Sequence, residues 1–226
     1  YTRKEYVSGL FYEYTYDYLN KYMVVAGIRI DYHSLYRFFL TPRLNMKYNI
    51  LSNLILRASA GRGLRTASVF AENISLLASS RKIILNNFNN DFPYGLKPEI
   101  AWNYGFNLTY NFTLDYRQGS ISVDIYRTDF ENQVIVDIDK NPHEADVYNL
   151  VGKSFSNSLQ FQGDYELIKR LDLRLAYRYY DVKTTYSDEL LEKPLTSKHR
   201  FLANLSYNTR NFWNIDLTIN TQGPKR

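Results

Sequence analysis

The sequence predicts an all-β protein, an antiparallel up-and-down transmembrane β-barrel of which about ten strands are present. Three observations lead to this fold class. Apolar and polar residues alternate with a period of two along most of the 226 residues. The alternating segments run for about 9 to 14 residues, which suits a tilted strand crossing a bilayer, whereas globular strands average about 5 to 6 residues. Short turns also alternate with long connections, as in outer-membrane barrels.

The alternation is clearest in the segment that starts at Ile100. Ile100, Trp102 and Tyr104 fall on one face, and Ala101 and Asn103 fall on the other. The same reading, applied along the whole chain, predicts strands over residues 10–16, 24–32, 40–48, 54–60, 100–112, 121–125, 155–167, 173–179, 201–207 and 215–219.

The two faces of these predicted strands differ in chemistry. One face is apolar, with Tyr, Phe or Trp recurring toward the strand ends, which is typical of a lipid-facing band between aromatic girdles. The opposite face carries charges in the middle of the strands, and we expect it to line a wet interior. The charged residues on this face are Arg29, Asp31, Arg43, Lys47, Arg57, Asp124, Arg174 and Arg178.

The connections divide into two kinds. Short links are expected near residues 18–21, 49–52, 114–119, 168–170 and 209–212, and longer ones at residues 62–98, 137–147 and 183–198. The short links would be periplasmic turns and the long ones extracellular loops. The loop over residues 62–98 is too long for a plain connector. Its apolar stretches predict a short helix and a strand extension lying over the barrel mouth.

Composition and spacing argue against several functions. The 28 basic and 23 acidic residues give a charge of +5, but they are scattered singly, so nucleic-acid binding is not implied. Asp31, His33 and Ser34 lie close in sequence, but Ser34 points away from the other two on a strand, and we expect a structural histidine facing the lumen. The sequence therefore predicts no enzyme, no catalytic residue, no metal site and no cofactor.

Two stretches carry a family resemblance. "GLRTASV" begins at Gly63, and "LKPEIAWNY" supplies Leu96, Pro98, Asn103 and Tyr104. They resemble two motifs of TonB-dependent outer-membrane receptors, although Ala67 stands where proline is common and Gly105 replaces the usual Glu. The resemblance implies a barrel of 22 strands, filled by an N-terminal plug. We therefore expect residues 1–226 to be one partial barrel domain, a fragment that lacks the plug domain.

The resemblance also implies a function. It predicts a receptor in the bacterial cell outer membrane, surrounded by outer-membrane lipid, that takes up a scarce ligand of the siderophore-iron, cobalamin or glycan class. Energy would come from the TonB complex through the missing N-terminal region. The expected ligand contacts are basic loop residues, namely Arg62, Arg65, Arg81 and Lys82. A passive porin-like channel and a soluble all-β binding module remain alternatives.

Strand parity adds one specific prediction. Counting from Arg57, Arg65 and Glu99 both fall on the lumen side, at the two ends of the long loop. We expect them to form a charge-assisted pair at the extracellular rim that fixes the base of this loop. The alternative is two separately solvated rim charges.

Overall fold

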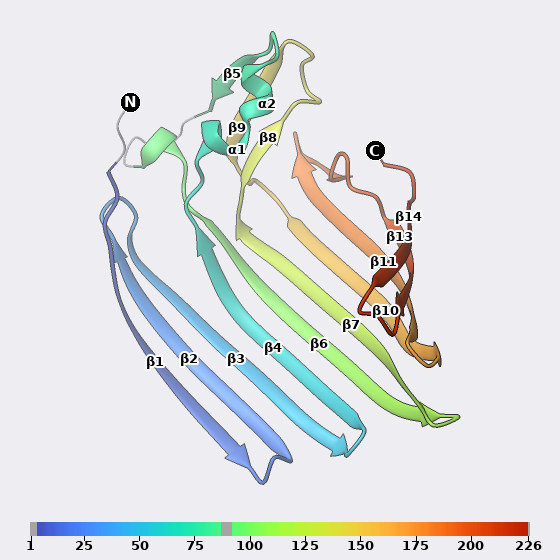
Figure 1. The fold of residues 1–226 in the computed structure, drawn as a ribbon. Helices are drawn as coiled ribbons and strands as arrows, with labels where there is room; N and C mark the ends of the chain where they lie inside the picture. The colour runs from blue at the N-terminus through green and yellow to red at the C-terminus, as the bar shows by residue number, and fades with distance from the viewer. Residues whose placement is uncertain (1–3, 87–91, 226) are drawn as a thin grey trace.

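The computed structural model describes residues 4–86 and 92–225. A curved antiparallel sheet dominates it, with tilted strands that follow one another in chain order (Figure 1). The main path contains ten strands, as the sequence predicts, and each predicted segment lies within one of them. These strands are β1 (Val7–Tyr18), β2 (Tyr22–His33), β3 (Arg37–Leu51), β4 (Leu54–Arg65), β6 (Glu99–Leu114), β7 (Arg117–Asn132), β10 (Ser154–Ile168), β11 (Leu171–Tyr186), β13 (His199–Asn208) and β14 (Asn214–Gln222).

Shorter elements lie in the long connections at one end of this sheet. Between β4 and β6 the chain forms α1 (Val69–Glu72), α2 (Ile74–Leu77), β5 (Lys82–Leu85) and the 3-10 turn η1 (Pro93–Gly95). Between β7 and β10 it forms β8 (Val134–Asp137) and β9 (Glu144–Asn149), and after β11 it forms β12 (Glu189–Glu192). Among the described residues, no helix is long and apolar enough to cross a membrane.

The two longest loops share a small sheet of their own. β5 pairs in parallel with β9, which pairs antiparallel with β8, so the strand in the first loop completes the hairpin of the second. Val69, Leu96 and Val147 form the buried core beneath it. For residues 82–88 the sequence predicts a strand extension over the barrel mouth, and residues 82–85 form β5, which joins the separate small sheet. The last residues of that stretch, 87 and 88, lie outside the described residues.

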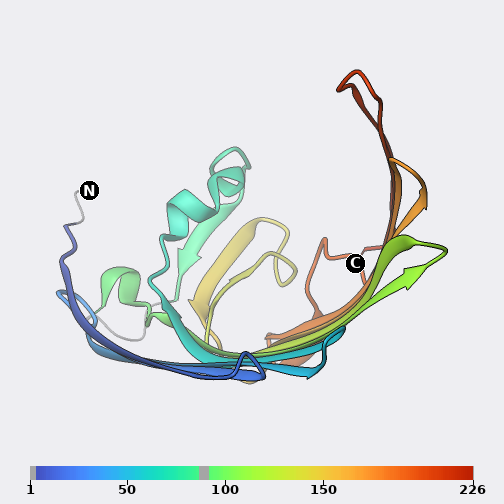
Figure 2. The same ribbon diagram turned by 60° about the horizontal axis from the view of Figure 1, so that its bottom comes forward.

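The polar face of the main sheet is its concave face. The sheet forms a trough, and α1, α2, β5, β8 and β9 lie inside it (Figure 2). Arg65 has the parity of the polar face and contacts Glu72 of α1, which places that face toward the inside. The apolar, aromatic-rich residues of alternate parity therefore cover the convex face.

Register aligns the polar residues into rows that cross the sheet. In one row, Arg57 of β4 donates to Asn107 of β6 (3.1 Å), and Asn107 donates to Asp124 of β7 (2.8 Å). Farther along the same row, Arg178 of β11 donates to Gln160 of β10 (2.5 Å). The row follows the register pairs Arg57–Asn107, Asn107–Asp124, Asp124–Gln160 and Gln160–Arg178.

A second row depends on a glycine. Glu13, Gly27 and Arg43 lie opposite one another on β1, β2 and β3. Arg43 crosses over Gly27 to pair with Glu13. A Cβ atom at Gly27 would lie 2.8 Å from Nε and 3.0 Å from Cγ of Arg43, so any larger residue would displace the bridging side chain.

We predict that Gly27→Val destabilises the folded protein by about 1 to 2 kcal/mol, because it breaks the Arg43–Glu13 pair and crowds the concave face. Gly163→Val is the matched control, since a Cβ at Gly163 meets nothing within 4 Å. The measurement is the urea midpoint of the refolded protein in lipid vesicles. Equal midpoints for the two variants would contradict this account.

Candidate functional site

The end of the sheet that carries the loops holds a junction of three charged residues. Arg65 and Glu99 lie directly opposite each other at the ends of β4 and β6. Arg65 Nε donates to Glu99 Oε2 at 2.6 Å, and its Nη1 lies 3.0 Å from Glu72 Oε2. The Glu72 Oε1 atom accepts from the backbone N–H of Ser68. One arginine thus connects two barrel strands with the first helix of the long loop.

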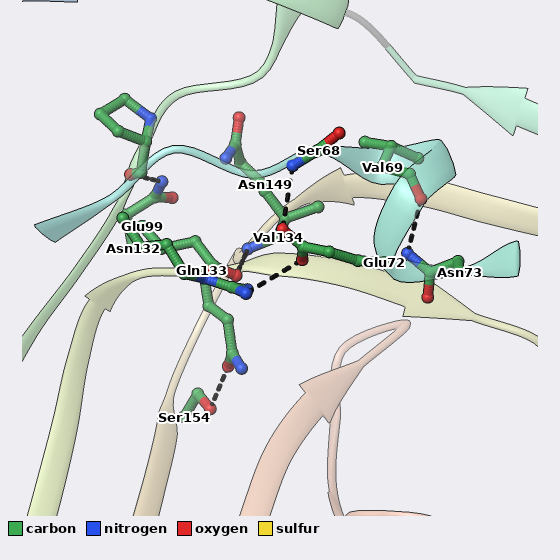
Figure 3. Close-up of polar contacts among 12 residues, drawn as sticks. Ser68, Val69, Glu72, Asn73, Glu99, Asn132, Gln133, Val134, Asn149 and Ser154 are labelled. Carbon is green, nitrogen blue, oxygen red and sulfur yellow. Dashed lines mark hydrogen bonds and ion pairs between the residues drawn. The ribbon is translucent and has the colours of Figure 1, made fainter.

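Glu99 also holds the second loop. Its side chain is buried, and its Oε1 accepts from the backbone N–H of Val134 at 3.0 Å, where β8 begins. Next to it, Asn132 Nδ2 donates to the carbonyl oxygen of Pro98 at 2.6 Å (Figure 3). A buried carboxylate that accepts from a guanidinium and an amide is well satisfied. Glu99 therefore fixes the bases of both long loops at one point.

A second buried carboxylate joins the loop sheet to the connection after β11. Asp137 Oδ2 accepts from the Tyr148 hydroxyl (3.2 Å) and from Ser187 Oγ (3.1 Å). Its Oδ1 accepts from the backbone N–H groups of Asp139 and Lys140. Burial raises the pKa of Tyr148 to about 12, so its hydroxyl remains a proton donor at neutral pH. Three connections of the chain are thus held together by Glu99 and Asp137.

The four basic residues that the sequence predicts as ligand contacts do not lie together in the structure. Arg81 Nη1 donates to the carbonyl oxygen of Ile138 at 2.7 Å, which links the two long loops. Lys82, at the start of β5, is exposed. Arg65 faces the concave side, but Glu72 and Glu99 both compensate its charge. Of these three residues, Lys82 presents its charge most openly.

Arg62 belongs to the other face. It has the parity of Leu64, and it binds Glu131 through Nη2 at 2.7 Å and the carbonyl oxygen of Leu40 through Nη1 at 3.0 Å. Trp102 Nε1 donates to the same carboxylate at 2.8 Å. Arg62 therefore lies on the convex face, away from Arg65 and the loops. Arg62 also lines a hollow with Arg29 and Arg43, and its contact with a ligand stays a prediction.

A cavity of about 360 Å³ lies beneath the helical part of the first loop, a volume at the lower end for a small-molecule site. It lies between the two long loops and the end of β11. Its walls combine apolar and charged groups, and they include Arg65, Glu72, Glu99, Ile135, Tyr186 and Lys193. A larger hollow of about 730 Å³ lies at the opposite end of the concave face, among Asp164, Arg174 and Asp216.

The residues considered for hydrolytic chemistry are not brought together. His33 is buried, its Nδ1 accepts from the backbone N–H of Leu35, and its ring packs edge-on against Tyr36. Asp31 pairs with Arg29, and Ser34 Oγ accepts from the backbone N–H of Tyr6. Within residues 4–86 and 92–225, no group of three or more His, Cys, Asp or Glu residues could hold a metal ion.

Several residues of this site carry no signal in the sequence. Asp137, Tyr148 and Ser187 are separated by up to 50 positions, and their contacts depend on how the loops pack. Glu131 is the extra residue at a register shift between β6 and β7, opposite Ile100 and Ala101. Strand parity alone places Arg65 and Glu99 on one face, because both lie in regular strands.

We predict that Glu99→Gln loosens both long loops, because the amide cannot replace the charge next to Arg65. Arg65 is partly exposed and keeps its ion pair with Glu72, so we expect the local stability of the loops to fall by only about 1 to 2 kcal/mol. Amide hydrogens in both loops should then exchange roughly tenfold faster. The measurement is amide hydrogen exchange of residues 66–86 and 134–149. Faster exchange in only one of the loops would contradict the shared anchoring.

Known proteins can be compared with this fold. A sequence model described as TonB dependent receptor-like, beta-barrel matches residues 1–225. No curated protein sequence matches. Among solved structures, the ferric enterobactin receptor of Pseudomonas aeruginosa superposes with a TM-score of 0.67 at 16% identity, over 98% of this chain and 33% of that chain.

Two siderophore receptors show the same likeness. PirA of Pseudomonas aeruginosa has a TM-score of 0.65 at 14% identity, over 98% of this chain and 38% of that chain. PirA of Acinetobacter baumannii has a TM-score of 0.66 at 12% identity, over 97% of this chain and 33% of that chain. At these identities the likeness shows the fold, and the chain spans about a third of the length of the receptors. The chain belongs to the family of TonB-dependent receptors, within their β-barrel domain.

Proposed function

We propose that this chain is part of the barrel of a receptor in the bacterial outer membrane that takes up an iron-siderophore complex, with energy supplied through TonB. The observation that carries the proposal is the loop assembly over the concave face. The two longest loops are joined in one sheet and fixed by Glu99 and Asp137, and they cover one end of a polar trough.

The two faces of the sheet support a membrane location. The convex face is apolar and aromatic, and the concave face carries hydrogen-bonded polar rows, which is the distribution expected for lipid outside and water inside. The outer edges of β1 and β14 have no partner strand among the described residues. In hydrocarbon, open edges leave backbone groups unsatisfied, so a closed barrel requires further strands.

The ligand proposal rests on the similar receptors and on the charge at the loops. The solved neighbours include the ferric enterobactin receptor in complex with enterobactin. In this chain, Lys82 offers an exposed positive charge on the loop sheet, and Lys193 lines the cavity beneath it. We propose that Lys82, with Arg65 and Arg81 behind it, receives an anionic iron chelate.

The test is growth of an iron-starved bacterium that lacks its own siderophore receptors and expresses the full-length protein. When this bacterium is supplied with a panel of ferric siderophores, we expect it to grow with at least one of them. We expect this growth to be lost when TonB is deleted. Growth that continues without TonB would favour a passive channel. A protein that remains monomeric and soluble without detergent would favour a soluble binding module.

Lys82→Gln should weaken binding of the anionic chelate about tenfold, the effect of losing one charge-assisted contact. Lys47→Gln is the matched control, since Lys47 is exposed and has concave-face parity but lies far from the loops. Binding is measured by fluorescence titration of the full-length receptor. Equal weakening in both variants would show that only net charge matters.

A further inference from the structure

The ladder between β3 and β4 stops before either strand ends. Their register runs from the short turn up to Arg43 opposite Gly61, and among the described residues no pair follows toward the loops. Residues 37–42 of β3 and 62–65 of β4 are still extended, and each stretch remains paired with the strand on its other side. The two strands separate toward the loops in Figure 1. We call these two unpaired edges the β3–β4 seam.

A proline stands where the ladder stops. The carbonyl oxygen of Leu40 points toward β4, since it accepts from Arg62 Nη1 at 3.0 Å. In a strand, backbone groups two residues apart point to the same side, so the nitrogen of Pro42 faces β4 as well. Proline has no N–H to donate to a neighbouring strand. The first donor that the ladder lacks is therefore the one that Pro42 cannot supply.

Arg62 joins the two edges of the seam through its side chain. Its Nε and Nη2 contact the two carboxylate oxygens of Glu131, at 3.2 and 2.7 Å, and its Nη1 remains for the carbonyl oxygen of Leu40. Trp102 Nε1 donates to Glu131 at 2.8 Å and helps to hold this carboxylate in place. A guanidinium can make these contacts together because its donors form a rigid fork. Among the described side chains, Arg62 is the one that bonds across the seam.

The seam is bounded at both ends by fixed contacts. On the side of the short turn, the ladder resumes at Arg43 and Gly61. On the side of the loops, Tyr36 lies in the turn that leads into β3, and it is 7% exposed. Its ring stacks on Phe92 of the first long loop, with ring centroids 5.6 Å apart. The seam is therefore a slot within the sheet, closed above and below.

Two glycines of β4 show how the spacing changes along the slot. A Cβ atom at Gly61 would meet β3 closely, at 3.6 Å from Cβ of Arg43. A Cβ at Gly63, two residues farther, would meet the carbonyl oxygen of Ala101 on β6 at 4.0 Å, and no described atom of β3 comes within that distance. Both glycines have the parity of the concave face. The contact between β3 and β4 is therefore lost within one repeat of the strand.

A hollow of about 340 Å³ reaches the seam. Its lining includes Thr41 and Arg43, which have concave-face parity, and Arg62, which has convex-face parity. We propose that the β3–β4 seam opens and closes as a slot in the sheet, and that Arg62 is its latch. Opening connects the hollow with the convex face, while the contacts at the two ends keep the strands in register. This inference does not depend on the proposed ligand.

Amide hydrogen exchange in the full-length protein tests the seam residue by residue. The N–H groups of Leu40 and of Leu64, which would lie opposite it if the register continued, face the seam. The N–H groups of Thr41 and Gly63 face the paired strands β2 and β6. We expect Leu40 and Leu64 to exchange about tenfold faster than Thr41 and Gly63. Equal exchange in the two groups would overturn the open seam.

Arg62→Lys tests the latch, because lysine keeps the charge but has no rigid fork to hold both partners of Arg62. The 226 residues contain no cysteine, so nitroxide labels at Leu40→Cys and Leu64→Cys can report the width of the seam by electron paramagnetic resonance. We expect a short and a long distance in the otherwise unchanged full-length protein. In Arg62→Lys the share of the short distance should fall about fivefold, as for the loss of one hydrogen bond to a charged group.

The matched control is a label pair one step below the seam. Leu44→Cys and Ala60→Cys lie opposite each other in the intact ladder, so their distance should stay single and short with Arg62 or with lysine at position 62. A single short distance for the seam pair as well would show that the seam stays closed. An equal change in both pairs would show that Arg62 supports the whole sheet, and either result overturns the latch.

Discussion

The whole structure depends on backbone hydrogen bonding between neighbouring strands. Every main strand pairs antiparallel with its neighbour in chain order, so the register of each pair is fixed by a short turn or by a long loop anchored at its base. An unpaired backbone N–H or C=O away from water is costly, which leaves little freedom for slippage. Because a shift by one residue would exchange the two faces, register also decides which side chains lie on the convex face and which on the concave face.

The polar rows follow from this register. Arg57, Asn107 and Asp124 are far apart in sequence, but they lie side by side because β4, β6 and β7 are aligned. Each donates to or accepts from the next, so the concave face satisfies many of its own polar groups. Gly27 has the complementary role, since the absence of a side chain lets Arg43 reach Glu13 on the second strand over.

The loops are held in place by two buried carboxylates. Glu99 accepts from Arg65 and from the amide of Val134, and Asp137 accepts from Tyr148 and Ser187. A buried carboxylate without donors would be strongly unfavourable, so each holds its donors in place. The loop assembly is therefore specified by a few polar contacts together with the small apolar core around Val69 and Val147.

The sequence by itself determined the ten strands, their two faces and the opposed positions of Arg65 and Glu99, because alternation with a period of two is local and carries over from strand to strand. Only the tertiary structure decided that β5 pairs with β9, that Asp137 binds Ser187, and that Arg62 binds Glu131 on the convex face. These contacts join segments separated by 50 or more residues, through loops and a register shift. No local pattern encodes such pairings, because their energy depends on which groups the folded chain brings together.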